Sequence, residues 1–324
     1  MKLIKTEDAV GHVLCHDMTQ IIKDQYKDAR FRKGHVVTEE DIPVLLSMGK
    51  EHLYVWEMTS GMVHENDAAE RLLALCGQEN MIRSGVKEGK IELKAACDGV
   101  FLVDSARLVA VNSQDEVMIA TRKGGMAVRE GDKLAGMRVI PLIIEEEKLR
   151  KAEQAAGDKP LLSLKPYVRK TACIVATGGE VKKGLIKDTF TPIVIDKLKT
   201  YGIETLEVVY SGDGVENVRD AVLTMREKKP DMILCTGGMS VDPDDNTPGG
   251  IKAAGANIIA YGAPVLPGAM FLLGYFDDGM PVMGLPGCVM YAGATVFDLV
   301  LPKIAADVPV TRADLAALGE GGLC

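Results

Sequence analysis

The stretch that decides the fold is residues 171–180, TACIVATGGE. Its first six residues form a continuous apolar run, which is typical of a strand buried on both faces of a parallel sheet. Gly178 and Gly179 follow almost at once, so the chain leaves this strand through a tight glycine turn. A buried strand that ends in a glycine-rich loop indicates the start of an α/β domain.

Strands and helices alternate through the residues that follow this turn. One helix has readable ends, because Asp188 or Thr189 can cap it, Pro192 suits its first turn and Gly202 follows its last. Further strands are predicted at 203–210, 231–236 and 281–285, with helices at 215–228 and in a segment that reaches about 305. Since parallel strands are joined by right-handed crossovers, residues 171–308 are expected to form a three-layer α/β domain with a mostly parallel sheet.

The first half of the chain divides into smaller parts by its pattern of apolar and charged residues. Residues 1–87 mix short β-like runs with a helical stretch at 39–49, which predicts a small α+β unit. Residues 88–150 hold short apolar runs at 91–95, 100–103, 108–111, 117–120 and 139–144, which predict a small β-rich domain. Residues 145–156 are charged without a clear apolar face, so a linker is placed at 151–170, and a tail at 309–324 follows the α/β domain.

Composition excludes several classes of partner. The chain has 324 residues, is 47% hydrophobic and carries a net charge of −8, which disfavours binding to nucleic acid or anionic lipid. Charges at Lys2, Lys5, Glu7 and Asp8 stand where a signal peptide needs an apolar run. No stretch reaches the roughly 18–20 apolar residues of a membrane helix, so a cytoplasmic protein that contacts no membrane is expected.

Cysteine and histidine are distributed unevenly. The seven cysteines are scattered without a C-x-x-C pair, and Cys173 and Cys235 sit inside apolar runs that place them in the core. His12, Cys15 and His16 allow a metal site, but packed or solvated side chains are the favoured interpretation because no fourth ligand is suitably spaced. Residues 65–324 contain no histidine, so chemistry in the α/β domain must depend on metal ions and electrostatics.

The loop at 236–248, TGGMSVDPDDNTP, combines close-approach glycines with a hydroxyl and three carboxylates. A helix that begins near Pro248 adds a positive dipole end for a phosphate. Clustered carboxylates repel phosphate, so a bridging cation is implied, and Mg²⁺ is the expected ion. The alternative is a polar surface loop. Two further loops, at 262–268 and 284–288, are compatible with a ligand cradle, although each alone is more often a structural turn. For Cys288, a packing role is favoured over that of a nucleophile.

Four motifs together resemble the molybdopterin-binding domain family in order and approximate spacing. They are 177–180, 236–240 with Asp245, 267–268 and 284–287, and the resemblance covers about 140 residues. This domain is shared by molybdopterin molybdenumtransferase and molybdopterin adenylyltransferase. The resemblance implies an α/β fold that contacts molybdopterin or its adenylated form through Thr177, Gly178, Gly179, Glu180, Thr236, Gly237, Gly238, Met239, Ser240, Pro267, Gly268, Leu285, Pro286 and Gly287.

The resemblance also implies a reaction, the Mg²⁺-dependent insertion of molybdate during molybdenum cofactor biosynthesis. Asp245 and Asp188 match the positions expected to be catalytic, and Asp242, Asp244 and Asp245 are the implied ligands of Mg²⁺. Two departures bear on catalysis. Gly179 stands where the transferase has an aspartate, and Cys288-Val289 replaces its Asn-Pro.

Two other functions stay open. In the first, the protein is a non-catalytic carrier that stores, senses or delivers the finished cofactor, and the glycine at position 179 favours it. In the second, the protein resembles the competence-damage proteins, which act on nicotinamide-type nucleotides, and the long N-terminal extension disfavours it. The expected partners are pterin and nucleotide small molecules. A homo-oligomer is also expected, because relatives with this domain associate and the run 271–276 offers an apolar surface.

Overall fold

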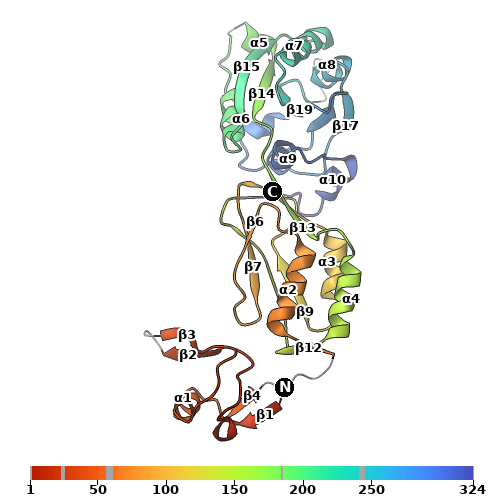
Figure 1. Ribbon diagram of the computed structural model, residues 1–324. Coiled ribbons are helices and arrows are strands. Elements are labelled where there is room, and N and C mark those ends of the chain that lie inside the picture. Colours follow the sequence, from red (N-terminus) through yellow and green to blue (C-terminus); the bar gives the residue numbers. More distant parts are fainter. Residues whose placement is uncertain (1, 23–25, 56–60, 184, 241–244, 324) are drawn as a thin grey trace. The chain divides into compact units, whose positions relative to one another are not determined.

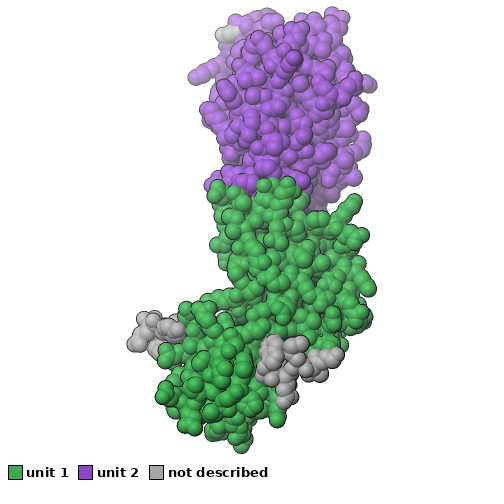
Figure 2. All heavy atoms as spheres, in the orientation of Figure 1, with its two compact units in different colours: residues 1–96, 103–124, 130–163 green, residues 97–102, 125–129, 164–324 purple. Residues whose placement is uncertain are grey.

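The computed structural model describes residues 2–22, 26–55, 61–183, 185–240 and 245–323. The chain forms two compact units (Figure 2). Unit 1 holds residues 1–96, 103–124 and 130–163, and unit 2 holds residues 97–102, 125–129 and 164–324. The finer boundaries expected from sequence, at 87, 150, 170 and 308, stay a prediction.

Unit 1 begins with small antiparallel pairs around a helix. The elements are β1 (Lys2–Lys5), η1 (Thr6–Asp8), β2 (Met18–Ile22), β3 (Tyr26–Phe31), α1 (Asp41–Ser47) and β4 (His52–Val55), with β1 paired to β4 and β2 to β3. Leu14, Leu45 and Leu53 are fully buried and form the centre of their core. The helix expected at 39–49 is therefore confirmed as α1, which packs inward through Leu45.

In the described residues, the rest of unit 1 holds a four-stranded antiparallel sheet in the order β6-β7-β11-β9, a two-stranded antiparallel sheet of β12 and β5, and three helices. Its elements are β5 (Met62–His64), α2 (Glu65–Cys76), β6 (Met81–Arg83), β7 (Ile91–Ala95), α3 (Ser105–Asn112), β9 (Val117–Thr121), β11 (Lys133–Val139), β12 (Ile143–Glu145) and α4 (Glu146–Ala156). Helix α2 buries Ala68, Leu72 and Leu73, which gives this sheet one apolar cover.

Two expectations for this region were wrong. The run 108–111 is part of helix α3 and not a strand, because the Asp104 side chain accepts the Arg107 N–H at 3.0 Å and caps a helix. The segment 145–156 does have an apolar face, since α4 buries Leu149, Ala152 and Ala156. These three residues lie three to four positions apart, as on one face of a helix. One leucine and two alanines form only a narrow apolar stripe, which the charged neighbours obscure in the sequence.

Unit 2 is built on a six-stranded sheet in the order β15-β14-β16-β19-β18-β17. Its strands are β14 (Thr171–Thr177), β15 (Glu204–Ser211), β16 (Met232–Thr236), β17 (Asn257–Tyr261), β18 (Leu272–Tyr275) and β19 (Pro281–Leu285). The first four strands in this order run parallel, and β18 and β17 are antiparallel to their neighbours. A separate three-stranded sheet joins β10 (Met126–Val128), β8 (Gly99–Val103) and β13 (Leu162–Pro166).

Helices cover both faces of the six-stranded sheet (Figure 1). Their bounds are α5 (Gly179–Lys182), α6 (Phe190–Lys199), α7 (Val215–Glu227), α8 (Thr247–Ala253), η2 (Gly287–Met290), α9 (Val296–Ala305) and α10 (Arg312–Ala317). One core cluster packs the sheet against α6, α9 and α10, and a second packs it against α7 and α8. Cys173 and Cys235 are fully buried in the second cluster, as expected. The expected three-layer α/β fold with a mostly parallel sheet is confirmed.

Strand β18 corrects one expectation about surfaces. The apolar run 271–276 was expected to be available to an interface, but Phe271, Leu273 and Phe276 are at most 3% exposed. Its side chains pack into the core clusters on both faces of the sheet, so the run offers no surface to a second chain. The expected homo-oligomer stays a prediction. Among the described residues, no helix is both long and apolar enough to cross a lipid bilayer.

Candidate functional site

The motif loops meet at one edge of the unit 2 sheet. Strands β14, β16 and β19 are neighbours and run parallel, so their carboxyl ends lie side by side. The loop before β18 reaches the same edge, because Leu272 at the start of β18 pairs with Gly284 near the end of β19. Ligands of such sheets collect beyond the carboxyl ends of the strands. The four sequence motifs are therefore brought together, as the alternation of strands and helices predicted.

Threonine hydroxyls connect the first two loops. Thr177 Oγ1 donates to the Thr236 carbonyl at 2.9 Å and lies 3.1 Å from Thr247 Oγ1. Thr247 Oγ1 in turn donates to the Gly237 carbonyl at 2.9 Å, and Thr247 is fully buried. These hydrogen bonds join the end of β14, the end of β16 and the start of α8 to one another. Thr247 was absent from the predicted site, and its role depends on contacts across 70 residues.

Gly237 makes the turn after β16 possible. Its φ is +81°, a conformation that residues with a side chain rarely adopt. A Cβ at this position would lie 2.4 Å from the Thr177 carbonyl oxygen, so there is also no space for a side chain. Both restrictions place the backbone of the second loop directly against the first. Close backbone approach of this kind is the local requirement for a phosphate-binding turn.

Asp245 organises the acidic end of the second loop. Its Oδ2 accepts the Ser240 N–H at 2.9 Å, which folds the loop back on itself. The Tyr261 hydroxyl donates to the Met239 carbonyl at 2.9 Å and fixes the loop from the side of β17. Burial raises the pKa of Tyr261, and the charge of Asp245 raises it further, so this hydroxyl stays protonated and remains a donor.

Asp213 is a site residue that the sequence patterns did not reveal. It lies between β15 and α7, and its Oδ2 accepts the Gly179 N–H at 3.0 Å. A Cβ on Gly179 would be only 2.6 Å from this oxygen, so the Asp213 carboxylate takes up the space where a residue 179 side chain would begin. The only signal in the sequence was the run Ser211-Gly212-Asp213-Gly214 directly after a strand.

Asp188 has a structural task at the same edge of the sheet. Its Oδ1 accepts the N–H groups of Phe190 and Thr191 at 2.9 and 3.0 Å, so it caps helix α6. Burial alone would raise the pKa of Asp188, but hydrogen bonds from Thr191 and Phe190 outweigh it and lower the pKa. The carboxylate is ionised and held in place. The helix ends expected from Asp188, Thr189 and Gly202 are confirmed.

The third and fourth loops contribute mostly backbone. Gly287 begins the short helix η2 and is exposed, and a Cβ there would meet no atom within 4 Å. Gly268 is instead packed, because a Cβ would lie 2.9 Å from Val296 at the start of α9. Burial raises the pKa of the Cys288 thiol, which favours the protonated form and agrees with a packing role.

The predicted contact residues fall into two groups by exposure. Thr236, Met239, Gly268, Leu285 and Pro286 are buried and support the loops from below. The half-buried or exposed residues, which form the open surface at this edge, are Thr177, Gly178, Gly179, Gly237, Gly238, Ser240, Pro267 and Gly287. The backbone of Glu180 lies in α5. Asp242 and Asp244 lie outside the described residues, so the predicted metal set stays a prediction.

The alternative metal site at the N-terminus has little chemical support. Cys15 is fully buried, and burial raises the pKa of its thiol, whereas a metal ligand must be a thiolate. No group of three or more metal-binding side chains is found in the part of the chain that the structure describes.

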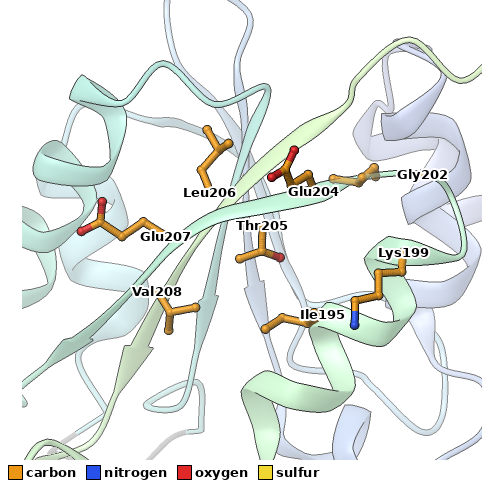
Figure 3. A pocket seen from close by; sticks show the side chains of 9 residues that line it. Ile195, Lys199, Gly202, Glu204, Thr205, Leu206, Glu207 and Val208 are labelled. Carbon is orange, nitrogen blue, oxygen red and sulfur yellow. The ribbon is translucent and has the colours of Figure 1, made fainter.

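A separate cavity of about 600 Å³ lies beside the outer strand of the sheet (Figure 3). It is lined by Thr205 and other residues of β15 and by Ile195 and Lys199 of α6. None of its nine described lining residues comes from the loops after β14, β16 or β19. The edge of the sheet where those loops meet is therefore the better candidate for a functional site.

Comparison with protein families adds an independent finding. Residues 173–306 match the family described as "Probable molybdopterin binding domain", a range that contains all four motifs. The resemblance expected for the C-terminal half of the chain is confirmed. Residues 3–57 match a second family, described as a domain of unknown function.

Individual relatives match shorter parts. A CinA-like protein of Mycobacterium tuberculosis (strain H37Ra) is 33% identical over 76 residues, which are 24% of this chain and 18% of that protein. A Mog protein of molybdopterin biosynthesis from Mycobacterium ulcerans has 21% identity and a TM-score of 0.36, over 43% of this chain and 99% of that structure. A molybdenum cofactor biosynthesis protein from Pyrococcus furiosus has 13% identity and a TM-score of 0.29, over 98% of this chain and 64% of that structure.

Proposed function

We propose that unit 2 binds molybdopterin or adenylated molybdopterin at the carboxyl edge of its sheet, and that the protein acts in molybdenum cofactor biosynthesis by inserting molybdate. The observation that carries this proposal is the glycine turn at 237–238, which threonine hydroxyls lock against the loop after β14. The turn lies inside the range that matches a molybdopterin-binding family. Backbone amides and exposed glycines suit the phosphate and the flat ring system of a pterin.

The open surface at this edge fits such a ligand in two respects. Gly287 leaves space above η2, so a planar group can approach the backbone there. Lys182 lies beside Gly212, with its Nζ 3.9 Å from where a Cβ would stand, and brings a positive charge to an edge that also holds Asp213. A fixed cation beside backbone donors lowers the energy of a phosphate in this position.

Mg²⁺ is part of the proposal because of the donors that this loop offers. Asp245 accepts the Ser240 N–H through Oδ2, and its other carboxylate oxygen is the one that we assign to the cation. Mg²⁺ in phosphate-transfer sites is held by one or two carboxylates, water and substrate phosphates, so a site with few protein ligands is sufficient. Bound there, Mg²⁺ would neutralise charge on the phosphate groups of the substrate. Asp188 would act through α6, whose first turn it fixes.

The test is calorimetric titration of the full chain with molybdopterin and with adenylated molybdopterin, followed by an assay of AMP release. We expect both pterins to bind, and AMP to be released only when Mg²⁺ and molybdate are present. Asp245→Ala is expected to abolish release. Asp277→Ala is the matched control, because Asp277 is exposed in the turn before β19, at the opposite end of the parallel strands.

Failure has two forms that lead to different conclusions. Binding of either pterin without AMP release would contradict the enzyme and support a carrier that stores or delivers the cofactor. Absence of binding to both pterins would contradict the proposal as a whole.

A second candidate is a nucleotide-processing function of the competence-damage type. Sequence identity of 33% to a CinA-like protein favours it, although the match spans less than a fifth of that relative. Incubation of the chain with nicotinamide nucleotides, followed by chromatography of the products, tests it. Product formation that Asp245→Ala abolishes would support this candidate, and unchanged nucleotide would remove it.

A further inference from the structure

A segment beyond the family-matched range contacts the third motif loop. The match to the molybdopterin-binding family ends at residue 306, and the third motif, Pro267-Gly268, belongs to the loop 262–271 between β17 and β18. Residues 318–323, which follow α10, lie against this loop, and we call them the strap. The proposed function assigns no role to the strap. Its role therefore has to be inferred from its contacts with the loop.

A backbone hydrogen bond joins the strap to the loop. The Leu266 N–H donates to the Gly322 carbonyl at 2.7 Å, and Leu266 pairs with Leu323 in a parallel bridge. Leu266 stands directly before the third motif, so the strap fixes the chain one residue before Pro267. Pro264 and Pro267 have no N–H to donate. The Leu266 N–H is therefore a donor through which this part of the loop can be held.

The strap fits the loop closely at Gly322. This residue is buried, and a Cβ there would lie 2.4 Å from the Pro264 carbonyl oxygen and 2.5 Å from the Leu318 carbonyl oxygen. Both neighbours are backbone atoms, so neither can turn aside as a side chain can. Gly319 also faces Pro264, but a Cβ there would lie at 3.4 Å, an ordinary van der Waals distance. A side chain at position 322 must therefore separate the strap from the loop, whereas one at position 319 need not.

Helix α10 holds the strap to the body of unit 2. Thr311 and Asp314 form a capping box at the start of the helix, in which the Thr311 N–H donates to Asp314 Oδ2 at 2.8 Å. Leu315 is 2% exposed and belongs to the same core cluster as Val265 of the loop. The helix also lies beside β17 (Figure 1). Because the strap is fixed at its start, it can hold the loop in turn.

The third motif is restricted on two sides. A Cβ on Gly268 would lie 2.9 Å from Val296, so α9 closes one side, and the strap closes the other at Leu266. We propose that residues 318–323 are a positioning segment, which holds Pro267 and Gly268 in the geometry that the ligand requires. The inference rests on the proposed function, which places the pterin at the loops of this edge. A loop that is ordered before binding lowers the free-energy cost of binding.

The first test measures the strap without any ligand. In hydrogen exchange of the full chain, amides of 262–268 should exchange at least about threefold faster in Gly322→Ala than in wild type, because the Leu266 hydrogen bond is lost. Gly319→Ala is the matched control and should exchange as wild type does. Unchanged exchange of 262–268 in Gly322→Ala would overturn the inference. Faster exchange throughout β14 and β16 would indicate that unit 2 as a whole is destabilised, and would overturn the local role.

The second test measures the consequence for binding, by titration with molybdopterin and by AMP release from its adenylated form. We expect Gly322→Ala to weaken binding by about 3- to 10-fold, and to raise KM by a similar factor while kcat stays within about twofold of wild type. Thr311→Val removes the capping hydroxyl and should have a smaller effect in the same direction, whereas Thr311→Ser should behave as wild type. A contact with a purely structural role would not separate KM from kcat in this way.

The outcomes distinguish this inference from the proposed function. Pterin binding that Gly322→Ala does not weaken would overturn the positioning role and leave the proposed function intact. A fall in kcat without a rise in KM would overturn it as well. Absence of pterin binding to the wild-type chain would contradict the proposed function, and with it this inference. Weaker binding together with faster exchange confined to 262–268 would support both.

Discussion

Substitution of Gly237 by alanine tests the glycine turn through two separable costs. The φ of +81° penalises any residue with a Cβ by about 1–2 kcal/mol. The new Cβ would also lie 2.4 Å from the Thr177 carbonyl oxygen, and a backbone shift to relieve this contact costs about 1–3 kcal/mol. We therefore expect Gly237→Ala to lower the free energy of unfolding by about 2–5 kcal/mol, a large part of the roughly 5–15 kcal/mol of a typical domain.

Two other glycines serve as matched controls for these costs. Gly255 has a φ of +93° with no atom within 4 Å of a Cβ, so Gly255→Ala should cost only about 1–2 kcal/mol. A Cβ on Gly287 meets neither restriction, and Gly287→Ala should stay within about 0.5 kcal/mol of wild type. The assay is urea unfolding followed by circular dichroism, with hydrogen exchange of β16 amides to report on unit 2. If Gly237→Ala costs no more than Gly255→Ala, the reasoning from the Thr177 contact is refuted.

Three further predictions concern single side chains of the same edge. Thr247→Val should lower the free energy of unfolding by about 1–3 kcal/mol, because it leaves the half-buried Gly237 carbonyl without the donor that the buried Thr247 hydroxyl supplies, whereas Thr247→Ser should retain most of the stability in urea unfolding. Because the pKa of Asp188 is lowered in the folded state, its carboxylate stabilises the fold at pH values above the ordinary aspartate pKa of about 3.9. The loss of unfolding free energy in Asp188→Asn should therefore shrink as the pH falls below about 4, and a loss that is independent of pH would contradict this. Because burial raises the pKa of Cys288, iodoacetamide should alkylate it more slowly at pH 7 than it alkylates glutathione, as measured by mass spectrometry of the Cys288 peptide.

The parallel part of the fold could be predicted because its signals are local. Strands β14, β16 and β19 are short apolar runs that end in glycine or proline, and buried parallel strands have this pattern. The antiparallel strands β17 and β18 were missed. The segment between them contains Gly262, Pro264, Pro267 and Gly268, so it suggests a long loop, and only pairing with β19 places β18 inside the sheet.

Short apolar runs outside unit 2 were ambiguous for a physical reason. The four residues 108–111 include two valines, and such a run fits a strand or a helix equally well until its ends are considered. The Asp104 cap decides for a helix, and this signal was present in the sequence. In α4 the buried face consists of one leucine and two alanines, which charged neighbours conceal.

The site was predictable at the level of loops and less so at the level of contacts. Glycine-rich ends of adjacent strands must meet at one edge, so the gathering of the motifs follows from topology. The sequence did not identify three site residues, Asp213, Tyr261 and Thr247. Each lies outside the glycine motifs and contacts a motif residue that is far away in the sequence. The sequence predicted Asp188 or Thr189 as the cap of α6, and the hydrogen bonds from the Phe190 and Thr191 N–H groups to Asp188 Oδ1 show that Asp188 is the cap.

The most direct measurement of the central claim is hydrogen exchange of the full chain, followed by mass spectrometry, with and without molybdopterin. The account predicts that the pterin slows exchange of backbone amides in 177–183, 236–240 and 285–290, the loops that meet at the carboxyl edge of the sheet. Peptides of β6, β7 and β11 in unit 1 should exchange at unchanged rates. Protection confined to unit 1, or no protection when excess molybdopterin is present, would contradict the assignment of pterin binding to these loops.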